Sequence, residues 1–441
     1  MTRFLQQLPA GRAESVLPDK KPAMTEGEAR LEAERCLYCA DAPCTKACPT
    51  SIDVPGFIKR IASGNVRGSA RVIFEQNILG ASCSRVCPVE VLCEGSCVYE
   101  AWHHKPIAIG RLQRFATETA TATATGHAPG LLKGKASKST GGKRVACVGA
   151  GPASLAFAAT LALEGHHATV YDKRPLPGGL NTTGVAPYKL HADESLSEVE
   201  WVASLGVEIR CGAEIGKDVT AKQLLAEHDA VFLGLGLGED SKLGIPGEDG
   251  PGVVGATAWI EQMKLAPGAG AKLGGVIVVG GGNTAIDVAR ECAQLGAAEV
   301  TMVYRRGAAD MSGYDHEMSG ARKDGVRLVV HGKPVAVVRD AAGAVKALRV
   351  SAAGAGAERD LPCELVAVAI GQSKLRTVAQ QFPGVALDAR GCVVADAQTG
   401  ATGNPKVFSG GDCVNGGKEV VNAVAEGRNA ARHLLATWSA R

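Results

Sequence analysis

Eight of the fourteen cysteines fall in one short stretch of the chain, between positions 36 and 97. They form two groups, C-x2-C-x4-C-x3-C-P over 36–49 and C-x3-C-P-x4-C-x3-C over 83–97. Bacterial ferredoxins carry C-x2-C-x2-C-x3-C-P, in which the fourth cysteine ligates the other of two clusters. The first group is that run with its middle gap widened by two residues. The spacing favours two iron–sulfur clusters, and two four-cysteine zinc sites are the alternative.

A glycine-rich turn, Gly149-Ala-Gly151, follows the apolar run 144–148. An Ala- and Leu-rich helix is predicted at 152–163, and a second strand at 168–171 ends on Asp172. In such a strand–turn–helix–strand unit the helix N-terminus holds a pyrophosphate, and the acid accepts a hydrogen bond from a ribose. This unit therefore predicts an FAD site.

A second unit of the same kind carries Gly280-Gly-Gly282. Its strand, helix and second strand are predicted at 275–279, 284–295 and 299–304. Aligning the second strands of both units on their Val-Tyr pairs puts Arg305 where Asp172 stands, and Arg306 follows. Guanidinium groups grip a 2′-phosphate that an acid would repel, so this unit predicts an NADPH site. A solvated strand end is the alternative for the two arginines.

Two later segments complete the elements that must position these sites. The strand 407–409 runs into Gly410-Gly411-Asp412, and a helix is expected over 416–435. In flavoproteins with two dinucleotide domains the Asp of such a segment contacts FAD. The apolar strand at 366–370 returns the chain from an inserted domain.

The predicted fold class is α/β, with an N-terminal α-helical iron–sulfur domain followed by two Rossmann-type domains, the second inserted in the first. The domains are expected at 1–116 (clusters), 117–142 (linker), 143–255 with 375–441 (FAD) and 256–374 (NAD(P)H).

Composition narrows the class of protein further. Lys plus Arg total 48 and Asp plus Glu 45, a net charge of +3, which gives no reason to expect a nucleic-acid or membrane-surface partner. No apolar run approaches the length of a membrane span, and the N-terminus lacks the apolar core of a secretory signal. A cytoplasmic location is the resulting expectation.

The segment from CLYCADAPCTKACPT to QRFATE, residues 36–118, resembles the N-terminal iron–sulfur domain of dihydropyrimidine dehydrogenase. From about residue 25 onward the chain resembles the NAD(P)H-oxidising subunit of the bacterial enzyme, the PreT type. The resemblance implies that electrons pass from NADPH (or NADH) through FAD and two 4Fe–4S clusters to a partner FMN/iron–sulfur subunit, which reduces uracil or thymine. Such a subunit works in a hetero-oligomer, and the reaction needs no catalytic acid or cysteine in this chain.

The resemblance also implies which residues hold the groups. One cluster would be bound by Cys36, Cys39, Cys44 and Cys97, and the other by Cys48, Cys87, Cys93 and Gln113, which leaves Cys83 a non-ligand. FAD would be bound by Val86, Gly149, Gly151, Pro152, Ala153, Asp172, Lys173, Gly179, Leu180, Lys189, Ile215, Gly411, Asp412 and Val420. NADPH would be bound by Gly281, Gly282, Asn283, Thr284, Arg305, Arg306 and Gly371.

Three other functions are weighed against this one. The small subunit of glutamate synthase, or another NADPH–ferredoxin-type input subunit, would share the electron path and differ in its partner. A flavin disulfide reductase is disfavoured because none of the six cysteines outside the clustered segment forms a C-x-x-C pair. A zinc-bearing nucleotide-binding regulator is the alternative outside catalysis.

Overall fold

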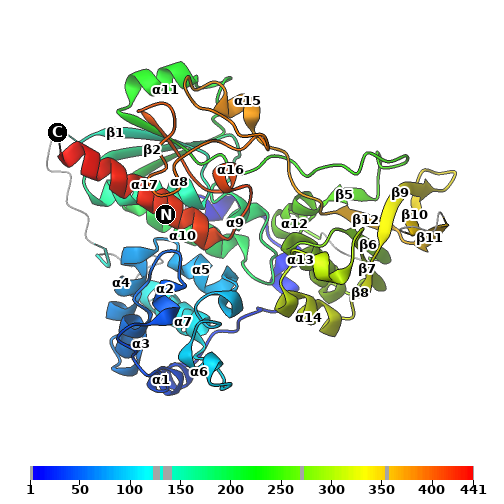
Figure 1. Ribbon diagram of the computed structural model, residues 1–441, viewed down its shortest axis with the longest axis horizontal. Helices are drawn as coiled ribbons and strands as arrows, with labels where there is room; N and C mark the ends of the chain where they lie inside the picture. The colour runs from blue at the N-terminus through cyan, green and yellow to red at the C-terminus, as the bar shows by residue number, and fades with distance from the viewer. Residues whose placement is uncertain (1–2, 123–129, 133–141, 269–272, 353–356, 441) are drawn as a thin grey trace.

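Two five-stranded parallel sheets of the same design organise the larger part of the chain in the computed structural model (Figure 1). The structure describes residues 3–122, 130–132, 142–268, 273–352 and 357–440. The first sheet has the order β13-β4-β1-β2-β3 and the second the order β5-β12-β6-β7-β8. In each sheet the strand that leads into a glycine turn, β1 or β6, lies at the centre. This is the place where a doubly wound sheet binds its ligand.

The strands are short, and β1, β4, β6 and β7 are almost fully buried, as strands covered on both faces must be, whereas the edge strands β3, β5 and β8 are partly exposed. Those of the first sheet are β1 (Arg144–Val148), β2 (His167–Asp172), β3 (Val207–Cys211), β4 (Ala230–Leu233) and β13 (Val407–Ser409). Those of the second are β5 (Val253–Gly255), β6 (Gly275–Val279), β7 (Glu299–Val303), β8 (Arg327–Val329) and β12 (Leu365–Val368).

Helices cover both sheets and bury their apolar side chains against them. The principal ones are α8 (Pro152–Leu163), α10 (Ala192–Ser204) and α17 (Val420–Ser439) at the first sheet, and α12 (Ala256–Leu265), α13 (Asn283–Gln294) and α14 (Asp315–Lys323) at the second. Shorter pieces are α9 (Leu180–Thr183), α11 (Ala221–Glu227), α15 (Arg376–Ala379), α16 (Asp412–Asn415) and the 3-10 turn η4 (Ala308–Asp310).

A small antiparallel sheet, drawn in yellow in Figure 1, extends the second domain. It consists of β9 (Gly332–Arg339), β10 (Val345–Ala352) and β11 (Glu358–Pro362). Val337 and Leu348 of this sheet share an apolar core with Ile277 and Val366 of the parallel sheet. The antiparallel sheet therefore belongs to the second domain.

The helical lobe at the bottom of Figure 1 has a core of its own, built around Phe57, Ile58, Ile61 and Leu112. Its helices are α1 (Glu26–Glu34), α2 (Pro43–Lys46), α3 (Val54–Ala62), α4 (Val66–Gln76), α5 (Gly80–Val86), α6 (Val98–Ala101) and α7 (Ile109–Ala122), with the 3-10 turn η3 (Val89–Val91). Cys44 lies in α2 and Cys83 in α5, and the other six cysteines of this segment lie on the irregular backbone between the short helices.

The predicted fold class is confirmed, and three element boundaries differ from those expected. β5 pairs with β12, although the expected division at 255/256 gives it to the first domain. Helix α7 runs through the expected start of the linker, and residues 123–129 and 133–141 of that linker lie outside the described ranges. α17 begins at Val420 because Gly416, at φ +88°, ends the short helix α16.

The N-terminal segment does not lie on the helical lobe to which the expected division 1–116 assigns it. Phe4, in front of the turn η1 (Leu5–Gln7), packs in the core of the first sheet. Ala13, in the turn η2 (Ala13–Val16), packs in the core of the second. Glu14 accepts a hydrogen bond from the N–H of Ala192 at 2.9 Å. The start of the chain therefore crosses both dinucleotide domains. Its sequence has no long hydrophobic periodicity from which this packing could be predicted.

Within the described ranges, no helix combines the length and the apolar character that crossing a bilayer requires.

Candidate functional site

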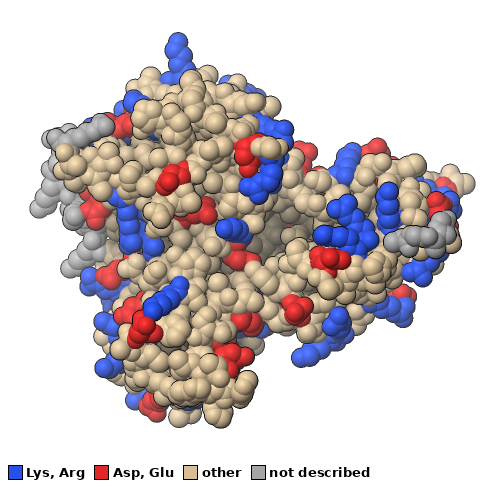
Figure 2. Space-filling model, in the orientation of Figure 1, with Lys and Arg blue, Asp and Glu red and all other residues tan. Residues whose placement is uncertain are grey.

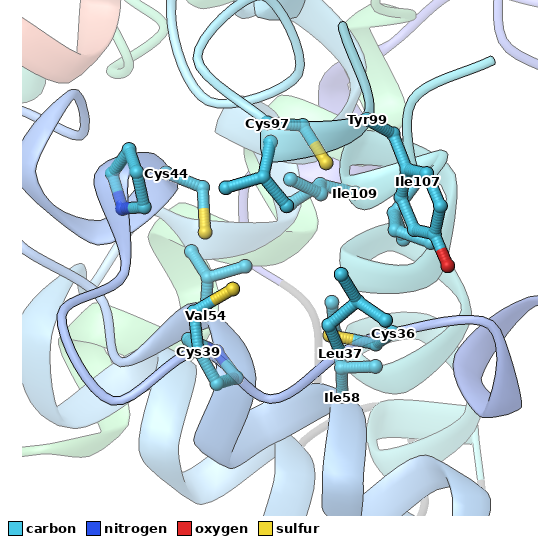
Figure 3. A pocket seen from close by; sticks show the side chains of 13 residues that line it. Cys36, Leu37, Cys39, Cys44, Val54, Ile58, Cys97, Tyr99, Ile107 and Ile109 are labelled. Carbon is cyan, nitrogen blue, oxygen red and sulfur yellow. The ribbon is translucent and has the colours of Figure 1, made fainter. Parts of the chain in front are cut away.

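Four cysteines line one pocket in the helical lobe: Cys36, Cys39, Cys44 and Cys97 (Figure 3). Three come from the first cysteine group and one from the end of the second, which is the set that the family resemblance implies. Apolar side chains of α3 and of the segment before α7 close the pocket around the sulfur atoms. Tyr38, between two of the cysteines, has φ +51°, so the backbone turns back there. The structure thus brings together thiols that are far apart in sequence.

The surroundings of this pocket disfavour free thiolates. Burial raises the pKa of Cys44 to about 11, and the charges of Cys36 and Cys97 add to the rise. Burial also raises the pKa of Cys36. Bound iron or zinc reverses this effect, because a coordinating thiol is deprotonated. Among the residues that the structure describes, no three His, Cys, Asp or Glu side chains form a site for a single metal ion. The donor set and the apolar walls fit an iron–sulfur cluster.

The second implied set lies nearer the dinucleotide domains. Cys48 and Cys87 both act electrostatically on Cys93, whose pKa is raised by burial and by these neighbours. A hydrogen bond with Cys83, together with burial, raises the pKa of Cys87. The three implied cysteine ligands are therefore neighbours in space, and Cys83 lies beside one of them.

Gln113 lies on α7 and is buried, with 8% of its surface exposed. Its amide Nε2 donates to the carbonyl oxygen of Gly80 at 2.7 Å. This bond fixes the orientation of the amide and leaves Oε1 as the atom with which Gln113 could bind iron. Whether Gln113 or Cys83 completes the second set stays a prediction.

The first glycine turn forms a cradle that side chains would fill. Gly149 has φ +92°, and a Cβ there would lie 2.4 Å from the carbonyl oxygen of Gly234. Gly179 has φ +56°, and a Cβ there would lie 2.8 Å from the Cα of Gly151. Pro152 opens α8, whose first N–H groups have no partner within the helix. Backbone donors without side chains in front of them fit a pyrophosphate, and hence FAD.

Asp172 stands at the end of β2, as the sequence predicts, and its carboxylate braces this turn. Oδ2 accepts from the N–H of Ala150 at 2.7 Å, and Oδ1 accepts from the N–H of Arg174 at 2.8 Å. Each oxygen keeps a lone pair for a ribose hydroxyl. Across the cradle, burial raises the pKa of Asp412, and Oδ1 of this residue accepts from the N–H of Lys418 at 3.2 Å.

The other residues implied for FAD differ in their burial and in their contacts. Ala153 meets Gly411 at the cradle, since a Cβ on Gly411 would lie 3.1 Å from that of Ala153. Val86, Leu180 and Val420 are half-buried, Ile215 is buried, and Lys173 is exposed. Lys189 is bound to the second domain: its Nζ lies 2.6 Å from Oδ1 of Asp287 and 2.9 Å from Oε1 of Glu317. In this structure Lys189 joins the two domains through these carboxylates.

The strand register corrects the alignment of the two units. Gly149 donates its N–H to the carbonyl of Tyr171, and Gly280 donates to that of Val303. The residue in the position of Asp172 is therefore Tyr304, and Arg305 lies one place further on. The shared Val-Tyr pair misled the alignment because equal letters need not occupy equal ladder positions. Both arginines still lie within three residues of the end of β7, so the NADPH interpretation keeps its basis.

The second glycine turn is held by aromatic and amide side chains. A Cβ on Gly281 would lie 2.6 Å from the ring of Tyr304, and Oδ1 of Asn283 accepts from the N–H of Tyr314 at 2.9 Å. Exposed positions around the turn are Thr284, Arg305, Arg306 and Gly371, while Gly282 is half-buried. Figure 2 shows a hollow beside this domain, with Lys and Arg side chains gathered on the right-hand lobe.

Comparison with known families agrees with this geometry. A profile described as dihydropyrimidine dehydrogenase domain II, 4Fe-4S cluster, matches residues 14–125. A profile described as pyridine nucleotide-disulphide oxidoreductase matches residues 143–427. The chain belongs to the pyridine nucleotide-disulphide oxidoreductase family. Its helical lobe is a 4Fe-4S domain, so the cysteine segment is an iron–sulfur rather than a zinc segment.

Relatives of this oxidoreductase match it along nearly its whole length. The PreT subunit of NAD-dependent dihydropyrimidine dehydrogenase from Escherichia coli is 35% identical, and the match covers 96% of this chain and 97% of PreT. The NADPH glutamate synthase small chain from Escherichia coli is 34% identical over 93% of this chain and 92% of its own. The oxidoreductase AegA, also 34% identical, is longer, and this chain spans 65% of it.

Solved structures support the fold. Thioredoxin reductase from T. acidophilum matches 67% of this chain and 99% of its own, with a TM-score of 0.56 and 20% identity. FAD, an NAD(P)H cofactor and 4Fe–4S chemistry are thus properties of the oxidoreductase. The assignment of single residues to each group remains a proposal.

Two charged side chains that the sequence reasoning missed tie the 4Fe-4S domain to the FAD domain. The buried carboxylate of Glu198, on α10, accepts from the N–H of Ala81 at 2.9 Å and from the hydroxyl of Ser82 at 2.5 Å, at the start of α5. Arg428, on α17, donates from Nη1 to the carbonyl oxygen of Thr50 at 2.7 Å. The sequence offers no signal for either residue, because α10 carries four acidic residues and α17 two arginines, and nothing local marks one of them as buried.

Proposed function

We propose that the chain is the electron-input subunit of a dihydropyrimidine dehydrogenase. In this proposal electrons from NAD(P)H pass through FAD and two 4Fe–4S clusters to a partner FMN subunit, which reduces uracil or thymine to the 5,6-dihydropyrimidine. Bound FAD would supply the step between a two-electron hydride donor and one-electron clusters. The chain itself binds, orients and insulates these groups.

The order of the two cysteine sets along the molecule carries the proposal. The second set lies toward the FAD domain, because Glu419, which precedes α17, acts electrostatically on Cys87, and Cys48 acts on Arg428 of α17. The first set lines the pocket between α3 and α6, further from the sheets. In this proposal electrons pass from the nicotinamide turn through the flavin turn to the second set and then to the first.

In this proposal the charged groups at the two glycine turns bind the two dinucleotides. Asp172 and the N-terminus of α8 would hold the two ends of the FAD adenosine diphosphate, and Arg305 with Arg306 would hold the 2′-phosphate of NADPH. Of the relatives named above, the PreT subunit belongs to an enzyme named as NAD-dependent, and the glutamate synthase small chain is named with NADPH. The arginine pair is the reason to propose NADPH here.

A second partner is supported by the comparisons. The glutamate synthase small chain is 34% identical and PreT is 35% identical, so similarity alone does not separate the two functions. The electron path is the same for both, and only the acceptor differs.

The decisive experiment measures products with defined partners. Protein purified without air should contain about eight irons and one FAD per chain, and should pass electrons from NADPH to ferricyanide. It should form dihydrouracil only after addition of a purified FMN subunit. Dihydrouracil formed by this chain alone would contradict the division of labour, and zinc in place of iron would contradict the electron path, because zinc carries no electrons. Activity only with a glutamate synthase large subunit would support the second partner.

A further inference from the structure

Arg428 is a buried cation with no carboxylate partner among the described residues. It lies in α17, and 8% of its surface is exposed. Its Nη1 donates to the carbonyl oxygens of Thr50 and Gln76, at 2.7 and 2.6 Å, and Nη2 donates to Oδ1 of Asn429 at 3.2 Å. Its Nε is buried and has no partner in the part of the chain that the structure describes. No Asp or Glu of those residues forms an ion pair with it. A buried charge in this state is costly unless a counter-charge is supplied.

Thr50 links Arg428 to the sulfur of Cys48. Burial and the neighbouring Arg432 lower the pKa of Arg428 to about 10, whereas Cys48 raises it. Thr50, which accepts from Arg428 through its carbonyl, also contacts the sulfur of Cys48 through its hydroxyl at 3.2 Å. Arg428 is charged at neutral pH, and it binds the same residue, Thr50, that contacts the sulfur of Cys48, a predicted ligand of the second cluster.

We propose that Arg428 is a positioning residue that supplies the counter-charge of the second cluster and raises its reduction potential. This inference rests on the proposed function, since it takes Cys48 as a cluster ligand. Each electron that a cluster accepts makes it more negative by one unit, and a fixed cation nearby stabilises the reduced state. Net charge and hydrogen bonds around the sulfur atoms are the means by which proteins set cluster potentials.

The position of Arg428 links this effect to the flavin. It extends from the same helix, α17, that begins at Val420 beside the predicted FAD site, and it reaches the backbone on the C-terminal side of Cys48. Together with Glu198, Arg428 therefore joins the two domains, and its charge favours arrival of the electron at the second cluster.

The test is a potentiometric titration of the holoenzyme, followed by the EPR signals of the reduced clusters. Arg428→Gln should weaken the reduction equilibrium of one cluster at least tenfold. For a one-electron couple this lowers the midpoint potential by about 59 mV. Arg428→Lys, which keeps the charge, should keep most of that potential. Arg432→Gln, an exposed position one turn further along α17, is the matched control and should change the equilibrium less than threefold.

Each outcome decides the question. The counter-charge role of Arg428 would be overturned if Arg428→Gln left the midpoint potential unchanged. It would also be overturned if Arg428→Lys lowered that potential as much as Arg428→Gln does. If Arg428→Gln binds no iron, a second measurement uses the wild-type protein labelled with 15N-arginine. Pulsed EPR of this protein should detect a guanidinium nitrogen at the reduced cluster, and Arg428→Lys should lose this coupling. Absence of the coupling from the wild type would overturn the inference. Absence of iron from the wild type would instead contradict the proposed function.

Discussion

The guanidinium of Arg306 lies over the ring of Tyr304, with 5.4 Å between its central carbon and the ring centroid. Its Nε donates to the hydroxyl of Tyr304 at 3.0 Å, and that hydroxyl donates to the carbonyl of Asp310 at 2.7 Å. The same ring packs on Gly281 of the second glycine turn. Tyr304 therefore holds Arg306 in place beside the turn, and both Arg306 and Arg305 are exposed. An arginine fixed in this way loses little entropy when it binds a phosphate.

Replacing both arginines by alanine should shift the preference of the enzyme from NADPH toward NADH. A hydrogen bond to a charged group contributes about 1.5–3 kcal/mol, so the ratio of kcat/KM for the two nicotinamides should change by more than tenfold. Arg327→Ala, at an exposed ion pair with Glu299 on neighbouring strands, is the control. An unchanged ratio in the double variant would show that the pair is only a solvated strand end.

Gly427→Ala should destabilise the FAD domain and lower its flavin content. Gly427 is buried where α17 crosses α8, and a Cβ there would lie 2.0 Å from the carbonyl oxygen of Ala153. Overpacking costs about 1–3 kcal/mol, and here backbone must move at the FAD turn. Thermal unfolding and the FAD absorbance per chain measure the two effects. Gly27→Ala, in α1 with open space around it, should cost nothing; equal behaviour of the two variants would contradict this packing argument.

Glu198 should make the stability of the protein depend on pH. Burial raises the pKa of Glu198 to about 7, although hydrogen bonds from Ser82 and Ala81 oppose the rise. Because the folded-state pKa lies above the usual value of about 4.3, the folded state binds the proton more tightly than the unfolded chain. Its contribution is complete below about pH 4.3 and is lost as the pH rises through 7, on the order of 3 kcal/mol over the window.

The measurement is the melting temperature between pH 5 and pH 8. Glu198→Gln cannot ionise, so the fall in melting temperature over this range should be smaller in the variant than in the wild type. Glu75→Gln changes a surface carboxylate that pairs with Arg71, and it should keep the wild-type slope. Parallel curves for Glu198→Gln and the wild type would rule out this role.

Strong local sequence patterns made the fold predictable, whereas contacts between distant parts of the chain could not be predicted. The strands β1 and β6 and the helix α8 begin and end where the apolar runs and glycine turns predict. The convergence of Cys97 with the first group was accessible only through the family resemblance, since no local period relates them. Arg428 and Glu198 could not be found because their meaning depends on a partner in another domain. The register at Tyr304 required the hydrogen-bond ladder itself.

The last prediction concerns the fourth ligand of the second cluster. Gln113→Ala should change the occupancy or the midpoint of that cluster, because it removes a buried amide that Gly80 orients. Cys83→Ser should leave both clusters intact, because the thiol of Cys83 already has a hydrogen-bond partner in Cys87 and serine can replace it there. Iron content and EPR of both variants measure the outcome. Cys83 is the better donor by chemistry alone, since thiolate binds iron more strongly than an amide oxygen. If iron is lost from Cys83→Ser and retained in Gln113→Ala, the assignment must be exchanged, and the second cluster is held by four cysteines.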